Sequence, residues 1–124
     1  MKNIDSQINY VELPARDLEA VKRFYGQAFG WTFEDFGPEY TAFHGAGLAG
    51  GFFKANLASI ARNGSALVVL YADDLTTTLE RVKSCGATIS QEIFSFPGGQ
   101  RFHFSDPVGN ELAVWSVPPD QTDE

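Results

Sequence analysis

The sequence predicts an α+β fold in which two βαβββ modules form one curved, mixed sheet of eight strands, with the helices on its outside. Two observations predict it. Each half of the chain carries short alternating apolar segments and one amphipathic helix. Leu13–Leu18 also matches Leu70–Leu75, and Gly30 matches Gly86 at nearly the same spacing. Since neither half can bury both faces of its sheet alone, we expect the halves to pack around a cleft.

The first half is expected to contain a strand, a helix and three further strands. Ile8–Leu13 alternates as a strand does, and Asp17 is a favourable N-cap for a helix over Leu18–Phe29 that Gly30 ends. Apolar residues alternate or cluster between turn signals in the next three segments. These predicted strands are Trp31–Phe36, Tyr40–His44 and Leu48–Phe53.

Residues 54–66 are expected to form a linker, after which the pattern repeats. Leu67–Ala72 predicts a strand, Asp74 caps a helix over Leu75–Cys85, and Ala87–Phe94 contains another strand.

The chain closes with a predicted hairpin around Asp106-Pro107-Val108-Gly109, a sequence typical of a tight turn. Before the turn, Phe102 and Phe104 share one face of a strand, and Arg101 and His103 share the other. The hairpin therefore has one apolar face and one mixed face.

A single domain over residues 1–120 fits the chain of 124 residues, with module 1 at about 6–53 and module 2 at about 67–117. The acidic segment 118–124 is expected to be a frayed tail. Apolar residues make up 44% of the chain, which is enough for a packed core.

Charge and composition exclude several classes of function. A net charge of −7 leaves no basic stripe for nucleic acid and does not suit an anionic membrane surface. The chain contains neither an apolar run long enough to span a bilayer nor the apolar core of a signal peptide. Cys85 is the single cysteine, so no intrachain disulfide can form. We therefore expect a cytoplasmic protein.

Several motifs resemble the vicinal oxygen chelate superfamily, which includes glyoxalase I, extradiol dioxygenases, fosfomycin-resistance proteins and bleomycin-binding resistance proteins. The resemblance covers residues 8–116. It rests on Val11-Glu12-Leu13-Pro14 with Asp17-Leu18, Phe24-Tyr25 with Phe29-Gly30-Trp31, Asp74-Leu75 with Gly86, and Asp106-Pro107-Val108-Gly109-Asn110. It implies a cup between the modules and a homodimer with the cups near the interface.

The resemblance also implies where a metal would be bound. Metal-dependent members carry His, Gln or Glu ligands on four strands, at positions that fall on Tyr10, Leu67, Ala113 and the neighbourhood of Gly51 in this sequence. A divalent first-row metal needs imidazole or carboxylate donors. Since these residues offer at most a phenol, we expect no metal cofactor.

Strand parity places a mixed set of side chains in the cup. His103 and Glu111 are the candidate acid/base pair. Arg101 is the candidate anchor for an anion, although pairing with Glu111 or Glu12 is an alternative. Candidates for ligand binding are Tyr10, Glu12, Leu67, Tyr71, Arg101, Ala113 and Trp115, with Val69 also lining the cup.

These features favour a protein that binds a small organic molecule, partly aromatic or carboxylated, in a metal-free cup. One alternative is an enzyme of the same superfamily, a lyase, isomerase or dioxygenase-like protein that uses His103 and Glu111 or a displaced metal site. Another is an interaction module whose cup has no ligand.

Overall fold

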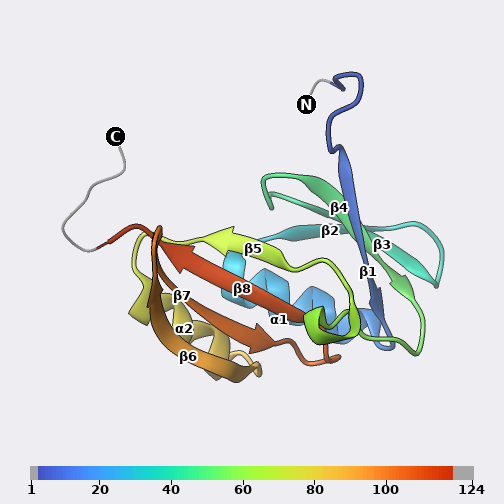
Figure 1. Cartoon of the computed structure of the whole chain (residues 1–124). Helices are drawn as coiled ribbons and strands as arrows, with labels where there is room; N and C mark the ends of the chain where they lie inside the picture. Colours follow the sequence, from blue (N-terminus) through green and yellow to red (C-terminus); the bar gives the residue numbers. More distant parts are fainter. Residues whose placement is uncertain (1–2, 119–124) are drawn as a thin grey trace.

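The computed structural model describes residues 3–118 and contains eight strands and two α-helices (Figure 1). The predicted acidic tail lies almost entirely outside the described residues. The elements are β1 (Tyr10–Ala15), α1 (Leu18–Phe29), β2 (Thr32–Asp35), β3 (Tyr40–His44), β4 (Ala49–Lys54), the short 3₁₀ helix η1 (Ala61–Asn63), β5 (Val68–Tyr71), α2 (Leu75–Ser84), β6 (Thr88–Phe96), β7 (Gly99–Ser105) and β8 (Glu111–Ser116).

The strands form two mixed sheets with the same topology. The first sheet has the order β1-β4-β3-β2 and the second has the order β5-β8-β7-β6. In each, the first strand of the module runs parallel to the last, and the other pairs are antiparallel. The predicted fold class and its two βαβββ modules are confirmed. Hydrogen bonding, however, divides the eight strands into two sheets of four instead of one continuous sheet.

Local signals set the bounds of α1 where the sequence predicted them. The Asp17 carboxylate accepts a hydrogen bond from the backbone N–H of Ala20 at 3.1 Å, which satisfies one of the free donors of the first turn. Gly30 ends the helix with φ of +76°, a conformation that costs glycine little.

The core lies on the helix side of both sheets, and α1 contributes to both halves of it. Figure 1 shows α1 passing behind β5 and β8 beside the first sheet. Ring centroids of Phe24 and Phe104 in β7 are 5.8 Å apart, and those of Tyr25 and Phe52 in β4 are 5.4 Å apart. All four side chains are fully buried. The two sheets are therefore joined through α1 and share one core.

The helices also contact each other. The Arg81 guanidinium in α2 donates through Nε to the carbonyl oxygen of Ala28 in α1, at 2.7 Å. Ala28, Phe24, Leu79 and Val82 are all buried, as predicted for the inner faces of the two helices. The contact between helices was not predicted, since the sequence indicated only that both helices pack on the outside of one curved sheet.

Strand bounds differ from the prediction where tertiary contacts decide them. β1 begins two residues late and runs through Pro14 to Ala15, because its parallel partner β4 extends to Lys54. β6 continues to Phe96 with two register shifts against β7, and such bulges have no local sequence signal. The linker contains η1, which the sequence did not indicate.

The turn between β7 and β8 joins both modules through buried polar groups. Asp106 accepts a hydrogen bond from the hydroxyl of Tyr25 in α1 at 2.7 Å. Asn110 donates to the carbonyl oxygen of Pro14 in β1 and accepts from the backbone N–H of Ser59 in the linker, both at 2.8 Å. We call Asp106 and Asn110 the turn hub. The sequence predicted the turn but not these long-range contacts.

No helix in the described part of the chain combines the length and the apolar character needed to cross a membrane.

Candidate functional site

Each sheet has one face in the core and one face without a helix, which we call its open face. Register and alternation place Tyr10 and Glu12 on the open face of the first sheet. The same argument places Val69, Tyr71, Arg101, His103, Glu111 and Trp115 on the open face of the second sheet. The predicted parity is therefore observed, but the two sets belong to different sheets.

Three side chains of the second sheet form a hydrogen-bonded row, which we call the Arg101 row. Arg101 donates through Nε to Nε2 of His103 at 3.2 Å, and Nδ1 of His103 lies 3.2 Å from Oε2 of Glu111. The other carboxylate oxygen of Glu111 accepts a hydrogen bond from the backbone N–H of Ala61 in η1 at 3.0 Å. The row runs from the open face to the linker.

The hydrogen bonds of the Arg101 row define the protonation state of its histidine. A guanidinium only donates, so Nε2 of His103 must present its lone pair to Arg101. The proton then lies on Nδ1 and is donated to Glu111. In this arrangement His103 is neutral, although it is buried next to a cation and an anion.

The hydrogen bond from Ala61 holds the pKa of the Glu111 carboxyl below its ordinary value, and the contact with His103 adds to this effect. Glu111 is thus ionised at neutral pH, which suits an acceptor of two hydrogen bonds.

Aromatic rings surround the guanidinium of Arg101. Its central carbon lies 6.0 Å from the ring centroid of Phe94 and 5.6 Å from that of Phe96, within the range of cation–π attraction. Trp115 is directly opposite Arg101 in the β7–β8 register, and its ring packs edge-on against Tyr71 at 5.1 Å. A planar apolar group placed beside the guanidinium would meet these rings.

A cleft of about 470 Å³ adjoins the row on the linker side. His103 and Glu111 line it together with Arg62 and Ala61 of η1. The remaining lining is mostly small or uncharged, with Ile60, Ser90, Gln91, Ser105 and Gly109.

The open face of the first sheet carries a different cluster. The hydroxyl of Tyr40 donates to Glu12 at 3.0 Å, so Tyr10 supplies the proton in its 2.6 Å hydrogen bond to Tyr40. Burial raises the pKa of Tyr40, and the hydrogen bonds to Tyr10 and Glu12 raise it further. We call these three residues the tyrosine cluster, and all three are neutral or acidic.

The structure brings some predicted site residues together and separates others. Arg101, His103 and Glu111 are in one row, but Glu12 belongs to the tyrosine cluster, so neither proposed partner of Arg101 forms an ion pair with it. Ala113 is fully buried although it is on the open face. Leu67 is half-buried just before β5.

Sequence reasoning missed Tyr40, Phe94, Phe96 and the backbone of Ala61. Alternation along Tyr40–His44 places Tyr40 on the same face as Ala42 and His44, which was a usable signal. The positions of Phe94 and Phe96 depend on register shifts in β6, for which the sequence has no signal.

The four positions for which the resemblance implies metal ligands offer one donor atom, the hydroxyl of Tyr10, and that hydroxyl is hydrogen-bonded to Tyr40. The hydroxyl of Tyr40 already fills the space where a side chain on Gly51 would project, and Leu67 and Ala113 have no donor atoms. Among residues 3–118, no three His, Cys, Asp or Glu side chains are grouped so that they could hold a metal.

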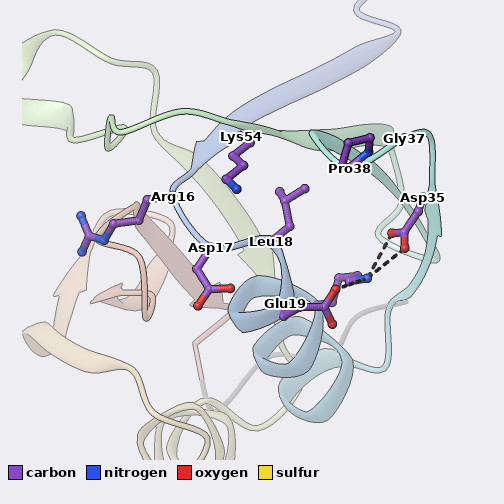
Figure 2. Close-up of a pocket in the computed structure, with 9 residues that line it drawn as sticks. Arg16, Asp17, Leu18, Glu19, Asp35, Gly37, Pro38 and Lys54 are labelled. Carbon is purple, nitrogen blue, oxygen red and sulfur yellow. Dashed lines mark hydrogen bonds and ion pairs between the residues drawn. The ribbon is translucent and has the colours of Figure 1, made fainter.

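A second cleft of about 370 Å³ lies at the start of α1 (Figure 2). Its charges compensate one another. Lys22 contacts Glu19 at 2.8 Å and Asp35 at 3.1 Å, which are the dashed lines in Figure 2. Arg16 and Lys54 also line this cleft, and its lining contains no histidine that could form a row like that of Arg101, His103 and Glu111.

This fold and these two open sheet faces define a protein built from duplicated βαβββ modules. The sequence model of the Glyoxalase/Bleomycin resistance protein/Dioxygenase superfamily matches residues 7–114. The chain belongs to this superfamily.

Relatives with this fold have diverse descriptions. A "Glyoxylase-like domain-containing protein" of Didymella fabae is 26% identical over 132 residues, covering 93% of this chain and 97% of its own. A glyoxalase-related enzyme from Fulvimarina pelagi superposes with a TM-score of 0.74 at 21% identity, covering 90% of this chain and 88% of its own. The fosfomycin resistance protein FosX from Listeria monocytogenes gives 0.76 at 16% identity, covering 94% and 98%. At such identities the structural likeness establishes the fold alone.

Proposed function

We propose that this protein binds a small organic anion, partly aromatic and carrying a carboxylate, on the open face of the second sheet without a metal ion. The observation that carries the proposal is the position of Arg101. Its Nε is engaged by His103, and within residues 3–118 its two Nη groups form no hydrogen bond. A carboxylate can accept from both groups of a guanidinium at once.

The surroundings of Arg101 support an aromatic ligand. The rings of Phe94 and Phe96 lie beside the guanidinium, and the ring of Trp115 packs edge-on against Phe96 at 6.2 Å. Tyr71 is 39% exposed and Phe94 is 37% exposed, so part of this apolar surface is open to a ligand. Binding would cover it and strengthen the charge interaction by excluding water.

Binding is tested by calorimetric titration with benzoate and with benzamide, which has the same ring but no charge. We expect benzoate to bind and benzamide to bind much more weakly. Arg101→Ala should weaken benzoate binding by about 1.5–3 kcal/mol, the usual loss for one charge-assisted contact. Arg16→Ala, an exposed arginine in the cleft of Figure 2, is the matched control. Equal affinity of wild type and Arg101→Ala would refute the proposal.

The proposed site needs no metal, because its anchor is a guanidinium and the inferred metal-ligand positions carry neither imidazole nor carboxylate. Protein purified without a histidine tag should contain well under one Zn, Ni, Mn or Fe per chain by elemental analysis. Benzoate affinity should be the same after dialysis against EDTA. One metal per chain that resists dialysis would contradict this part of the proposal.

An enzyme is the second candidate, favoured by the contact between His103 and Glu111. An imidazole whose tautomer is fixed by a carboxylate is a suitable general base. Here its lone pair is occupied by Arg101, so the side chain of Arg101 would have to move before His103 accepts a proton from a substrate. Turnover of a bound carboxylate that His103→Phe abolishes would favour the enzyme, in its metal-free form.

A homodimer and a cytoplasmic location remain predictions. Exposed aromatic and aliphatic side chains on both open faces, Tyr10, Val69 and Tyr71 among them, support self-association. Sedimentation velocity would give the oligomeric state. The location rests on the single Cys85, which suits a reducing compartment.

A further inference from the structure

The linker end of the Arg101 row is Glu111, and its contacts with the linker determine how the guanidinium is held. Glu111 is fixed to the linker twice. Its backbone N–H donates to the carbonyl oxygen of Ser59 at 2.8 Å, and its side chain accepts from the N–H of Ala61 at 3.0 Å. The remaining carboxylate oxygen is then directed at Nδ1 of His103.

We infer that Glu111 is a positioning residue that holds His103 as its neutral Nδ1–H tautomer, so that His103 fixes Arg101 as the anion anchor and releases it on protonation. The inference rests on the proposed function for the role of Arg101 as anchor. The row itself does not depend on a ligand.

Protonation of His103 is incompatible with the observed row. A doubly protonated ring would present an N–H at Nε2 to the N–H of Arg101, placing two donors and two positive charges at a separation of 3.2 Å. The bond to Glu111 would survive, because Nδ1 already donates to it. The weaker member of the row is therefore Arg101, whose guanidinium would leave His103.

The other groups facing His103 do not remove this conflict. The adjoining cleft is lined by one further cation, Arg62 of η1, and by one carboxylate, that of Glu111. β6 contributes the uncharged Ser90 and Gln91 to this cleft. The ring of Phe94 lies 5.8 Å from that of His103.

Replacement of Glu111 by glutamine is informative because a carboxylate provides two acceptor oxygens and an amide provides one. The amide oxygen can accept from Ala61 or from Nδ1 of His103, but not from both through separate atoms as the carboxylate does. The N–H of Ala61 is a fixed backbone donor, whereas His103 can change tautomer, so the amide oxygen accepts from Ala61. The NH₂ then faces His103 and favours the Nε2–H tautomer. That tautomer has no acceptor for Arg101.

The row is tested by NMR of the full chain labelled with ¹⁵N, without any ligand. At pH 8 the wild type should show His103 protonated at Nδ1 only, and the Nε–H of Arg101 should exchange at least tenfold more slowly than that of Arg16. On acidification, this protection should be lost at the pH at which the imidazole of His103 takes up its second proton. Because these readings use the wild type, instability of a variant cannot obscure them.

Variants then separate positioning from folding. Glu111→Gln and His103→Phe should each abolish the protection of Arg101 and weaken benzenesulfonate binding at pH 8 at least fivefold. We choose benzenesulfonate because its charge is constant over this range of pH. Glu80→Gln, an exposed glutamate in α2, is the matched control and should change neither reading.

The possible outcomes distinguish this inference from the proposed function. An Nε2–H tautomer at pH 8, or protection of Arg101 that persists after His103 is protonated or in Glu111→Gln, would overturn the inference. If the row is found but Arg101→Ala binds benzoate as well as the wild type, the anchor role falls together with the proposed function. If Arg101→Ala weakens binding but the row is absent, the proposed function survives alone.

Discussion

The two modules share a backbone plan and differ in the chemistry of their open faces. Glu12 is opposite Gly51 in the first sheet as Val69 is opposite Ala113 in the second. By the same register, Tyr40, opposite Phe53, is the counterpart of Arg101, opposite Trp115.

Equivalent positions thus carry a phenol in one module and a guanidinium in the other. The tyrosine cluster contains a carboxylate and no cation, whereas the Arg101 row contains a cation, an imidazole and a carboxylate. The backbone register is the same in both modules because the buried face of each sheet fixes it. The side chains on the open faces are not constrained by the core and can differ. This difference is the reason that the proposed anion site lies in the second module.

The modules also differ in how their last turns are held. The turn Gly45–Leu48 of the first module is rich in glycine, with positive φ at Gly45 and Gly47. The corresponding turn of the second module carries the turn hub of Asp106 and Asn110, whose partners belong largely to the first module and the linker. The second module therefore depends on the first.

The largest expected effect tests the equivalence of the two halves of the shared core. Phe52→Ala and Phe104→Ala each remove a fully buried ring and should cost about 3–5 kcal/mol. Both variants should unfold in a single transition by circular dichroism, because α1 joins the sheets. Phe36→Ala, at an exposed position, should change stability by less than about 0.5 kcal/mol. Two separate transitions would show that the modules are independent.

The turn hub gives the next largest effect. Asn110→Ala leaves the carbonyl oxygen of Pro14 and the N–H of Ser59 without their observed partner. Each buried polar group left unpaired costs about 1–3 kcal/mol, so chemical denaturation should show a loss of about 2–4 kcal/mol. Asn63→Ala in η1 is a control with little expected effect. A loss below about 1 kcal/mol for Asn110→Ala would show that water replaces the hub.

A smaller effect depends on pH and concerns the second module alone. The lowered pKa of Glu111 means that its ionised form stabilises the fold. This contribution is present above the ordinary pKa of glutamate, near about 4.3, and is lost as the pH falls through the lowered value. Glu111→Gln should cost about 1–2 kcal/mol at pH 7, and urea titrations should show the gap narrowing on acidification. A gap independent of pH would contradict this origin.

The pKa of Asp106 is shifted in the opposite direction from that of Glu111. Burial raises the pKa of Asp106, although the hydrogen bond from Tyr25 lowers it in part. Its contribution to stability is fully present below the ordinary pKa of aspartate and is lost as the pH rises through the raised value. The two carboxyl groups therefore oppose each other in the dependence of stability on pH.

The smallest effect concerns the cleft of Figure 2 in the first module. Lys22 contacts Glu19 and Asp35, both largely exposed. Exposed ion pairs contribute about 0–1 kcal/mol, so Lys22→Ala should lower the melting temperature only slightly, and less in high salt. A loss comparable with Asn110→Ala would show that this cleft is structurally important.

The sequence predicted the elements well where the signals are local. Asp17 and Gly30 fix α1, and the alternation around Phe102 and Phe104 identifies the buried face of β7. The division into two sheets could not be predicted, because strand pairing between modules is a long-range property with no local signal in the sequence. Likewise, Tyr25 and Asp106 are 81 positions apart in the chain, and nothing local relates them.

The site was predicted in part for the same physical reason. Parity placed Arg101, His103 and Glu111 on one face, because alternation along a strand is a local property. Alternation along a strand does not show which side chains on that face contact each other. Arg101 contacts His103 and neither Glu12 nor Glu111, and the rings of Phe94 and Phe96 lie beside its guanidinium. β6 places these rings through irregular pairing that has no local signal.

The turn hub has a consequence for how this domain can be divided. Asp106 and Asn110 in the last turn of the second module form hydrogen bonds with Tyr25, Pro14 and Ser59. None of these three partners belongs to the second module. Cutting the chain in the linker would leave these groups facing water or each other. Neither half is therefore expected to fold alone, and the separable unit is the pair.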